Sequence, residues 1–202
     1  IAFLICACLM TFGYLRRPMY YAIWQGQHNY ITWLAKHGYD VNITDDYMNS
    51  VDIAFLYGSA RSHAHYNHDN PLPWDMRKPV ISKTTEVLIE NGLKQEYINY
   101  AMYQAIRLNL KDMFNMLIDH IDINQTVIIN IDSFNSEDIE ELSLMYQAID
   151  NGEEYYIKKL LYLKPDCKLI DGEGKDMIDH ALNCEDEKLR EILLEYINSN
   201  TS

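Results

Sequence analysis

Apolar and polar residues recur along this chain in short blocks that have the character of helices. The pentapeptide Met-Tyr-x-Ala-Ile occurs three times, at residues 19–23, 102–106 and 145–149. Each copy begins a short apolar stretch, and after a turn a second, more strongly apolar stretch follows. Internal self-similarity of this kind predicts a stack of small helical units, because each unit buries its apolar face only against its neighbours.

The first complete unit, residues 18–42, has the most regular pattern. The residues that carry the pattern in its first helix are Pro18, Met19, Tyr20, Ala22 and Gly26. The unit ends in Gly-Tyr-Asp-Val-Asn at residues 38–42. Together these residues resemble the ankyrin repeat, which reads T-P-L-H-x-A-A-x-x-G-H, then an I-V-x-L-L-L helix, then G-A-D-V-N. At the exit motif only Tyr39 differs, where the family has alanine.

The last unit matches the same family almost as well. Residues 171–182 follow the D-x-x-G-x-T-P-L-H-x-A hairpin and first helix. Gly174 stands where the β-turn requires a positive φ, and Asp176 is a clear N-capping residue. The predicted buried stripe of the second helix consists of Leu189, Ile192 and Leu193, at i, i+3 and i+4.

One alanine marks the first helix of each unit, and the steps between these alanines set the repeat length. They are Ala22, Ala54, Ala105, Ala148 and Ala181, at steps of 32, 51, 43 and 33 residues. An ankyrin unit repeats every 33 residues or so. The long steps predict insertions at residues 59–80 and 126–140. We expect alanine at these positions because a small side chain lets adjoining first helices approach closely.

The resemblance implies an all-α fold, an ankyrin-type helical solenoid of about five repeats with short hairpin loops. We expect a single domain over residues 1–198. The expected repeats cover residues 15–46, 47–96, 97–128, 140–170 and 171–198, after a helix of a preceding partial repeat at residues 1–14. The middle three units are degenerate, and only the first and last match the family closely.

The first 15 residues form an uncharged apolar run that is followed by Arg16 and Arg17. A buried helix of an earlier repeat and the end of a transmembrane or signal segment are both compatible with this run. The run is shorter than the roughly 20 residues that span a bilayer, and no basic region precedes it. We therefore favour the buried helix, with Gly13 as its C-terminal cap.

Composition and charge narrow the classes of function. The chain is 48% hydrophobic and 23% charged, which permits a buried core. Its formal net charge of −13 disfavours binding to nucleic acids and to anionic membranes, because like charges repel. The 16 tyrosines suit protein contact surfaces, although a biased genome composition accounts for them equally well.

The cysteines favour an intracellular, cytoplasmic location. Cys6, Cys8, Cys167 and Cys184 show no Cys-x-x-Cys spacing and no disulfide framework of the kind found in secreted domains. The chain also resembles host-directed ankyrin-repeat proteins of intracellular bacteria and large DNA viruses, because its divergent repeats carry insertions and it is rich in Tyr, Asn and Ile. That resemblance implies a virulence effector acting in the host cytoplasm.

Few residues point to chemistry. His63, His65 and His68 lie close together in the first insertion and are weak candidates for zinc ligands. A solvated loop is the interpretation we favour, because metal ligands usually come from separate elements that fix their geometry. The chain has no Gly-rich phosphate loop and no nucleophile-elbow motif. We therefore expect no metal, no cofactor and no enzyme activity.

Two further segments allow more than one interpretation. The acidic residues at 136–141 predict the start of a helix, because carboxylates in a first turn interact favourably with the helix dipole. Trp74 in the first insertion either anchors a partner or pins the insertion onto the helices. The sequence does not decide between these two roles for Trp74.

We expect a protein–protein interaction module that binds its partner through the concave surface and hairpin tips of the stack. The expected contact residues at the hairpins are Asp45, Asp46, Tyr47, Glu173 and Lys175. Those on the first helices are Tyr21, Gln25, Gln104, Arg107, Gln147 and Asp150, and Trp74 joins them. This surface is mostly acidic, which predicts a partner with Lys or Arg at its centre.

Two other classes of protein remain open. One is a metal-binding or enzyme-associated domain whose repeats position a catalytic region outside this chain. The other is an array of paired helices without hairpin loops. The exit motif at residues 38–42 and the turn at 171–175 argue against the second class.

Overall fold

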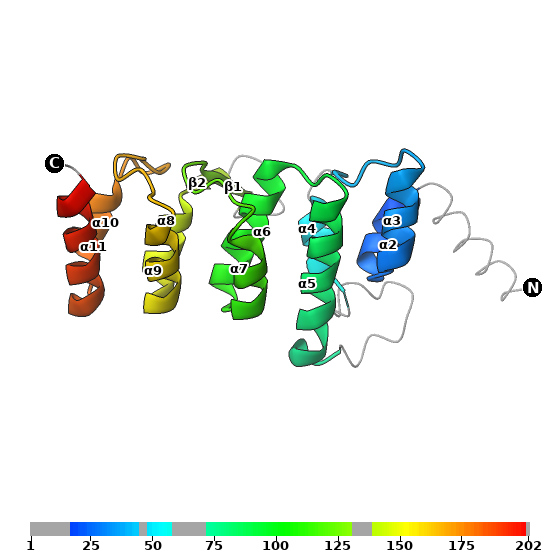
Figure 1. Ribbon diagram of the computed structural model, residues 1–202, viewed down its shortest axis with the longest axis horizontal. Helices are drawn as coiled ribbons and strands as arrows, with labels where there is room; N and C mark the ends of the chain where they lie inside the picture. Colours follow the sequence, from blue (N-terminus) through cyan, green and yellow to red (C-terminus); the bar gives the residue numbers. More distant parts are fainter. Residues whose placement is uncertain (1–16, 45–47, 58–71, 131–138, 201–202) are drawn as a thin grey trace, which may run out of the picture. The chain divides into compact units, whose positions relative to one another are not determined.

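The computed structural model describes residues 17–44, 48–57, 72–130 and 139–200, and in these ranges the chain is mostly helical (Figure 1). The all-α class is confirmed at this level, with one pair of short strands added. No helix in the described ranges is long and apolar enough to cross a membrane. The expected helix at residues 1–14 lies outside the described residues.

The chain divides into two compact units, Ile1–Tyr97 and Ile98–Ser202. From the sequence we expect residues 1–198 to form one domain. An array in which each pair of helices contacts only its neighbours divides readily in this way, because no single core holds all of its elements together.

The first unit consists of two helical hairpins side by side. One is formed by α2 (Pro18–Trp24) and α3 (His28–Lys36), the other by α4 (Ser50–Phe55) and α5 (Trp74–Glu90). α2 packs against α4 and α3 packs against α5, so first helices lie beside first helices and second beside second. The apolar side chains between them with at most 1% of their surface exposed include Ile23, Ile31, Leu34, Ile81 and Leu88.

α5 begins earlier than the sequence predicts. Its first residue, Trp74, lies inside the range 59–80 that the sequence analysis assigns to an insertion, and Pro79 does not end the helix. The Arg77 guanidinium donates from Nε to the carbonyl oxygen of Tyr57 at 2.6 Å and from Nη2 to that of Phe55 at 2.7 Å. Since carbonyls at a helix end lack intrahelical partners, Arg77 ties the first turn of α5 to the end of α4.

The second unit contains three helical hairpins. They are α6 (Gln95–Arg107, in this unit from Ile98 on) with α7 (Lys111–Leu117), α8 (Leu144–Asn151) with α9 (Glu154–Tyr162), and α10 (Met177–Asn183) with α11 (Glu187–Asn200). α8 packs against both α9 and α10. Asn151 on α8 also donates a hydrogen bond to the carbonyl oxygen of Ile106 on α6, at 3.0 Å.

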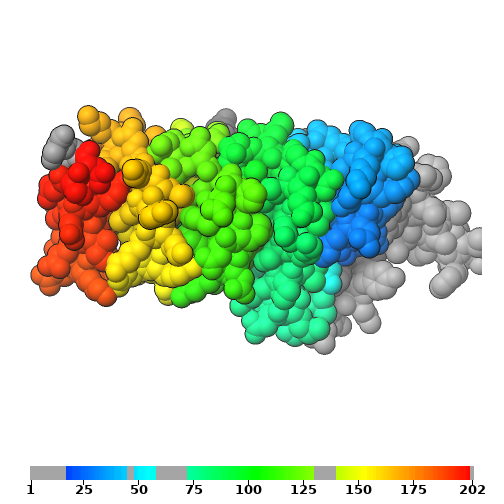
Figure 2. Space-filling model, viewed as in Figure 1, coloured from blue at the N-terminus to red at the C-terminus, as the bar shows by residue number. Residues whose placement is uncertain are grey.

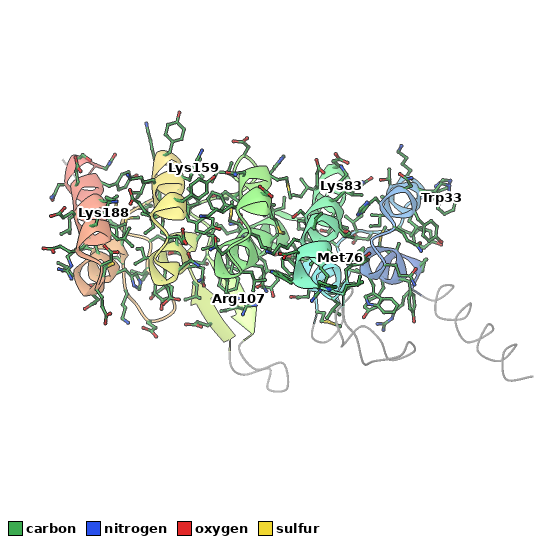
Figure 3. All side chains as sticks on the ribbon, turned by 90° about the horizontal axis from the view of Figure 1, so that it is seen from below. Trp33, Met76, Lys83, Arg107, Lys159 and Lys188 are labelled. Atoms are coloured by element: carbon green, nitrogen blue, oxygen red, sulfur yellow. The ribbon has the colours of Figure 1, made fainter. Side chains whose placement is uncertain are left out.

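The second helices of this unit are also neighbours. Lys111 of α7 pairs with Glu153 at 3.3 Å, and Lys188 of α11 pairs with Glu154 of α9 at 2.5 Å. The three helices appear as adjacent bands in the space-filling view (Figure 2). Seen from below, Lys159 of α9 and Lys188 lie on one side of the unit and Arg107 of α6 lies on the other (Figure 3). First and second helices therefore form two opposite layers.

A pair of short strands occupies part of the second predicted insertion, residues 126–140. β1 (Val127–Asn130) pairs antiparallel with β2 (Ile139–Leu142). The prediction that residues 136–141 begin a helix is therefore wrong for residues 139–141. Val127 and Leu142 are cross-strand partners, 2% and 5% exposed. Burial of this apolar pair favours the strand, because it stabilises more than the few tenths of a kcal/mol or so that a helix dipole offers exposed carboxylates.

The five repeated alanines are all buried in the structure. Ala22, Ala54, Ala105, Ala148 and Ala181 all have 0% of their surface exposed. α2 and α4 are in contact, as are α8 and α10, and one of these alanines lies on each of the four helices. The burial of these alanines agrees with the expectation that alanine permits close approach of first helices, which stays a prediction.

The turns after three of the first helices share one backbone conformation. The fourth residue after the alanine has a positive φ in three units: Gly26 at 61°, Asn109 at 52° and Gly152 at 74°. Gly174 in the last loop has a φ of 76°, which confirms the predicted turn. Asn109 replaces glycine at its position because asparagine tolerates the left-handed region better than most side chains do.

Asparagine side chains join successive loops in the same way in both units. The Oδ1 atom of Asn42 accepts a hydrogen bond from the N–H of Lys94 at 2.7 Å. In the second unit, Oδ1 of Asn124 accepts from the N–H of Asp166, also at 2.7 Å. Each bond connects the end of one hairpin to the end of the next, so the same contact between loops occurs in both units.

Candidate protein-interaction surface

The outward side of the first helices in the second unit carries tyrosines and charged residues. Tyr103 and Arg107 on α6, and Tyr146 and Asp150 on α8, are each four residues apart and so share a helix face. Arg107 and Asp150 are exposed, Tyr146 is half-buried, and Tyr103 is 8% exposed. We call the following set, which Tyr103 borders as a buried residue, the first-helix surface: Arg107, Glu140, Tyr146, Asp150, Glu173 and Lys175.

Burial and surrounding charges shift the pKa values of the two phenols in the same direction. The pKa of Tyr103 is raised, first by burial and then by the negative charges of Glu140 and Asp150, while Arg107 acts in the opposite direction. The pKa of Tyr146 is raised by burial, then by Asp150, Glu173 and Glu140, with Lys175 opposing. Both tyrosines therefore remain neutral hydrogen-bonding groups in a mostly acidic setting.

The loop that presents Glu173 and Lys175 is anchored by a buried carboxylate. Oδ1 of Asp171 accepts hydrogen bonds from the N–H groups of Glu173 and Lys175, both at 2.9 Å. Its Oδ2 atom pairs with Nε2 of His180 at 2.8 Å. Burial raises the pKa of Asp171, but the hydrogen bonds from Lys175, His180 and Glu173 outweigh burial and lower it overall. At the loop tip the Lys175 ammonium pairs with the Glu173 carboxylate.

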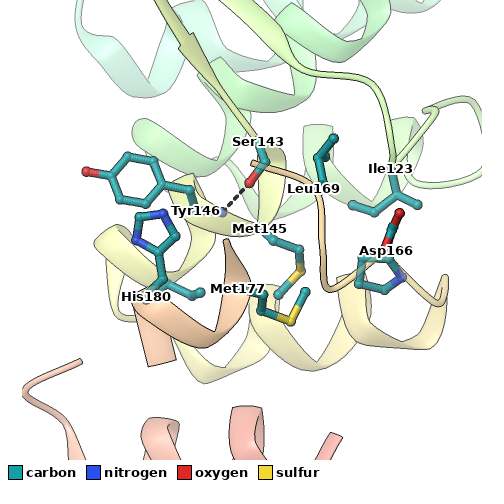
Figure 4. Close-up of a pocket in the computed structure, with 10 residues that line it drawn as sticks. Ile123, Ser143, Met145, Tyr146, Asp166, Leu169, Met177 and His180 are labelled. Atoms are coloured by element: carbon teal, nitrogen blue, oxygen red, sulfur yellow. Dashed lines mark hydrogen bonds between the residues drawn. The ribbon is translucent and has the colours of Figure 1, made fainter. Parts of the chain in front are cut away.

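A small cavity lies between α8 and α10, behind Tyr146 (Figure 4). The Tyr146 ring packs against the His180 ring with centroids 4.3 Å apart, and Oγ of Ser143 accepts from the N–H of Tyr146 at 3.0 Å. The cavity volume of about 10 Å³ leaves room for about one water molecule. Ligand pockets usually exceed about 300 Å³. We therefore assign His180 and Ser143 to structural roles.

Two of the expected contact residues are buried. Gln104 is 9% exposed and Gln147 is 7% exposed. Both stand directly before a repeated alanine, the position that His180 takes in the last unit, where it is also 9% exposed. Because the alanine faces the neighbouring hairpin, the preceding residue lies at the edge of that contact. The expectation that these glutamines point away from the core has to be corrected.

The expected contact residues in the first unit have local partners. Tyr21 is half-buried and meets Trp24 edge to face, with ring centroids 5.9 Å apart. The Gln25 side chain accepts a hydrogen bond from Gln27 Nε2 at 2.7 Å. Asp45, Asp46 and Tyr47 lie outside the described residues.

Trp74 contacts its own helix. Its ring lies 5.0 Å from the Arg77 guanidinium carbon and 6.0 Å from the Lys78 ammonium, measured to the ring centroid. Arg77 in turn binds the end of α4. These contacts favour the role in which Trp74 pins α5 in place over the role of partner anchor.

The histidine candidates for zinc binding, His63, His65 and His68, lie outside the described residues. In the described ranges, no group of three or more His, Cys, Asp or Glu side chains is placed to hold a metal ion. Cys167 and Cys184 are buried free thiols, and burial raises the pKa of Cys167.

Tyr146 and Glu140 are not among the contact residues expected from the sequence. Tyr146 is the second residue of the repeated pentapeptide, so the repeat itself marks it once the outward face is known. No sequence pattern indicates Glu140, because its position beside the first helices depends on the pairing of β1 with β2.

Comparison with protein-family models found none that matches this chain, and comparison with curated proteins found no match either.

Proposed function

We propose that this protein is an intracellular, non-enzymatic interaction module built of ankyrin-type repeats, and that its first-helix surface binds a partner protein. The observation that carries the proposal is the placement of Tyr146. This half-buried tyrosine sits among three carboxylates on a helix that is held on both sides by other helices. An aromatic group with fixed geometry and exposed charges around it is typical of a binding hot spot.

The repeat type is supported by features that recur in both units. Helices pair into hairpins, first helices meet through fully buried alanines, and asparagines join the ends of successive hairpins. The turn glycines or asparagine come four residues after the alanines. These are the positions at which the sequence resembles the ankyrin pattern.

The buried polar groups of the second unit are used for structure. Asn99 binds the backbone of Asp122 in both directions, at 2.7 and 3.0 Å, and Asp171 and His180 hold the last loop. The exposed charges of the first-helix surface are therefore the groups left for a partner. Among its acidic groups, Asp150 is exposed and Glu140 is half-buried, while Glu173 and Lys175 neutralise each other. We propose a partner that presents Lys or Arg to Tyr146 and Asp150.

The test compares two charge-reversal variants that change the net charge equally. Asp150→Lys with Glu173→Lys alters the first-helix surface. Glu191→Lys with Glu195→Lys alters exposed positions of α11 and is the matched control. Proteins captured from cell extract by the unaltered chain are identified, and their association is then measured with purified components at low and high salt.

We expect the Asp150/Glu173 variant to associate at least about tenfold more slowly at low salt, while the control binds nearly as the unaltered chain does. Salt should reduce the difference, because it screens exposed charges. Equal binding by both variants, or capture of no partner that binds in purified form, would contradict the proposal.

A further inference from the structure

The strand pair of the second unit has one edge that is closed and one to which no other described segment of the chain is hydrogen-bonded. The N–H of Gly172 donates to the carbonyl oxygen of Glu141 at 2.7 Å, so the loop before α10 covers the outer edge of β2. A Cβ atom on Gly172 would lie 3.2 Å from both the nitrogen and the oxygen of Glu141, which shows how closely the two backbones meet. The remaining edge of this sheet is β1.

The register shows which groups point outward from β1. Glu141 turns its carbonyl toward Gly172, so its peptide groups point away from β1. Its cross-strand partner is Ile128. In an antiparallel pair, partners of this kind both point their N–H and C=O groups away from the ladder. The N–H and C=O of Ile128 therefore face outward, and in the described part of the chain they make no backbone hydrogen bond outside the strand pair.

The side chain of Ile128 is exposed as well. Ile128 is 67% exposed, although its neighbour Val127 is only 2% exposed. Thr126 and Glu141 lie on the same face as Ile128, and the Thr126 hydroxyl donates to the Glu141 carboxylate. Native proteins usually protect such edges with a bulge, a proline or a charge on the strand itself. Over Val127–Ile129, β1 carries only β-branched apolar side chains.

We propose that the open edge of β1 is a docking site for an extended polypeptide strand of basic character, which pairs with the backbone of Ile128 and extends the sheet. Strand addition of this type obtains affinity from main-chain hydrogen bonds and specificity from alternating side chains. The side chain opposite Ile128 is apolar. The long basic side chains alternate with the apolar ones, so they lie on the other face and reach toward Glu140.

Charge complementarity selects this occupant. β2, the partner strand of β1, carries Glu140 and Glu141, and the whole chain has a formal charge of −13. A second copy of the chain would bring the same acidic strand and the same net charge to the edge, and like charges oppose that pairing. This site is independent of the proposed role of Asp150 and Glu173, because it depends on backbone groups of β1.

The probe is a synthetic peptide, Lys-Val-Lys-Val-Lys-Val, with capped ends. Its matched control has the same sequence and charge, but the backbone nitrogens of its valines are methylated, which removes their donors and blocks strand pairing. The readout is amide hydrogen exchange of the full chain, followed by NMR. In the peptide-free protein we expect the Ile128 amide to exchange freely.

We expect the unmethylated peptide at saturation to slow exchange at Ile128 at least about tenfold, and the methylated peptide to leave it unchanged. Binding of a basic peptide at the first-helix surface would shift the signals of Asp150 and Glu173 without protecting Ile128. The double variant of these two residues therefore retains protection at Ile128 if this proposal holds, whatever the outcome for the first-helix surface.

Ile128→Pro provides the second arm of the experiment. Proline lacks the outward N–H, which the β1–β2 ladder does not use, and proline is tolerated at such edge positions. We expect this variant to keep the strand pair and to lose most of the binding of the unmethylated peptide. Ile128→Thr keeps the N–H and is the control that should still bind.

Three results would overturn the proposal. The first is equal binding of the methylated and unmethylated peptides, which would reduce the interaction to general charge attraction. The second is an Ile128 amide already protected in the peptide-free protein, which would mean that the edge is covered. The third is a dimer in sedimentation that Ile128→Pro abolishes, which would make a second copy the occupant.

Discussion

At the residue scale, the turns of this chain depend on a few positions with a positive φ. Glycine fills this position at Gly26, Gly38 and Gly152, while Asn109 and Lys164 adopt it at φ of 52° and 57°. A side chain in the left-handed region costs roughly 1–2 kcal/mol. The non-glycine positions therefore carry some strain, which Asn109 offsets in part by accepting a hydrogen bond from the hydroxyl of Tyr156 at 2.7 Å.

Gly26 and Gly38 allow that strain to be separated from packing. A Cβ atom on Gly26 would lie 2.6 Å from Cγ1 of Val80, whereas nothing lies within 4 Å of one on Gly38. Gly38→Ala should lower the free energy of unfolding by about 1 kcal/mol through backbone strain alone. Gly26→Ala should lower it by a further 1–3 kcal/mol or so, because it also overpacks the contact with Val80. Urea unfolding of both variants measures the difference.

The double variant Gly26→Ala with Val80→Ala removes the colliding methyl group. It should recover part of the extra loss relative to the sum of the two single variants. Equal destabilisation by Gly26→Ala and Gly38→Ala would show that the contact with Val80 relaxes at no cost.

At the element scale, loops are held by carboxylates that bind the backbone two residues further along. Asp40, Asp122 and Asp166 accept from the N–H groups of Asn42, Asn124 and Lys168, at 2.8, 3.1 and 2.9 Å. Asp171 does the same for Glu173 but is buried and also bound to His180. The last loop therefore differs from the others in depending on a buried charge.

That dependence predicts a response to pH. Because the pKa of Asp171 is lower in the folded protein than its ordinary value, its contribution to stability is complete above about pH 5 and is lost as the pH falls through the folded pKa. Asp171→Asn should reduce the free energy of unfolding by about 1–3 kcal/mol at pH 7. The difference from the unaltered chain should shrink as the pH falls below about 4. Denaturant unfolding at several pH values measures it.

Asp119→Asn is the matched control. Asp119 is exposed and forms no hydrogen bond or ion pair in the described part of the chain. Its variant should leave the free energy of unfolding nearly unchanged at each pH. A difference for Asp171→Asn that stays constant from pH 7 to pH 3 would show that the carboxylate charge is not what holds the loop.

At the scale of the whole molecule, each compact unit is a short array in which a hairpin contacts its neighbours. The free energy of unfolding of such an array is close to the sum of a contribution from each hairpin and a contribution from each contact between neighbouring hairpins. α2 contacts α4, on which Ala54 is fully buried, and α8 contacts α10, on which Ala181 is fully buried. A substitution at either alanine should therefore have effects that remain within its own unit.

Ala54→Leu and Ala181→Leu test this directly. Each adds a large side chain at a position with 0% exposure, so each should destabilise by about 1–3 kcal/mol through overpacking. In hydrogen exchange with mass spectrometry, Ala54→Leu should speed exchange in α2 to α5, and Ala181→Leu in α8 to α11. The two variants serve as controls for each other, and faster exchange throughout the chain in either one would contradict local coupling.

The helical hairpins could be predicted from the sequence because local signals specify them. The repeated alanines predicted the helix contacts, Gly174 predicted the last turn, and Asp176 predicted a helix start that the structure confirms with a capping box. The charged part of the candidate surface was predicted in the same way, since Arg107 and Asp150 are at outward positions of helices that the repeat defines.

Other features depend on contacts between residues far apart in the chain, and only the tertiary structure decides them. The start of α5 at Trp74 depends on Arg77 reaching the end of α4. The strand at Ile139–Leu142 exists because Val127 lies opposite Leu142, and the open edge at Ile128 exists because Gly172 closes the other one. Sequence spacing determines which face a helical residue occupies, whereas a neighbouring element decides whether that face is buried, as it does for Gln104 and Gln147.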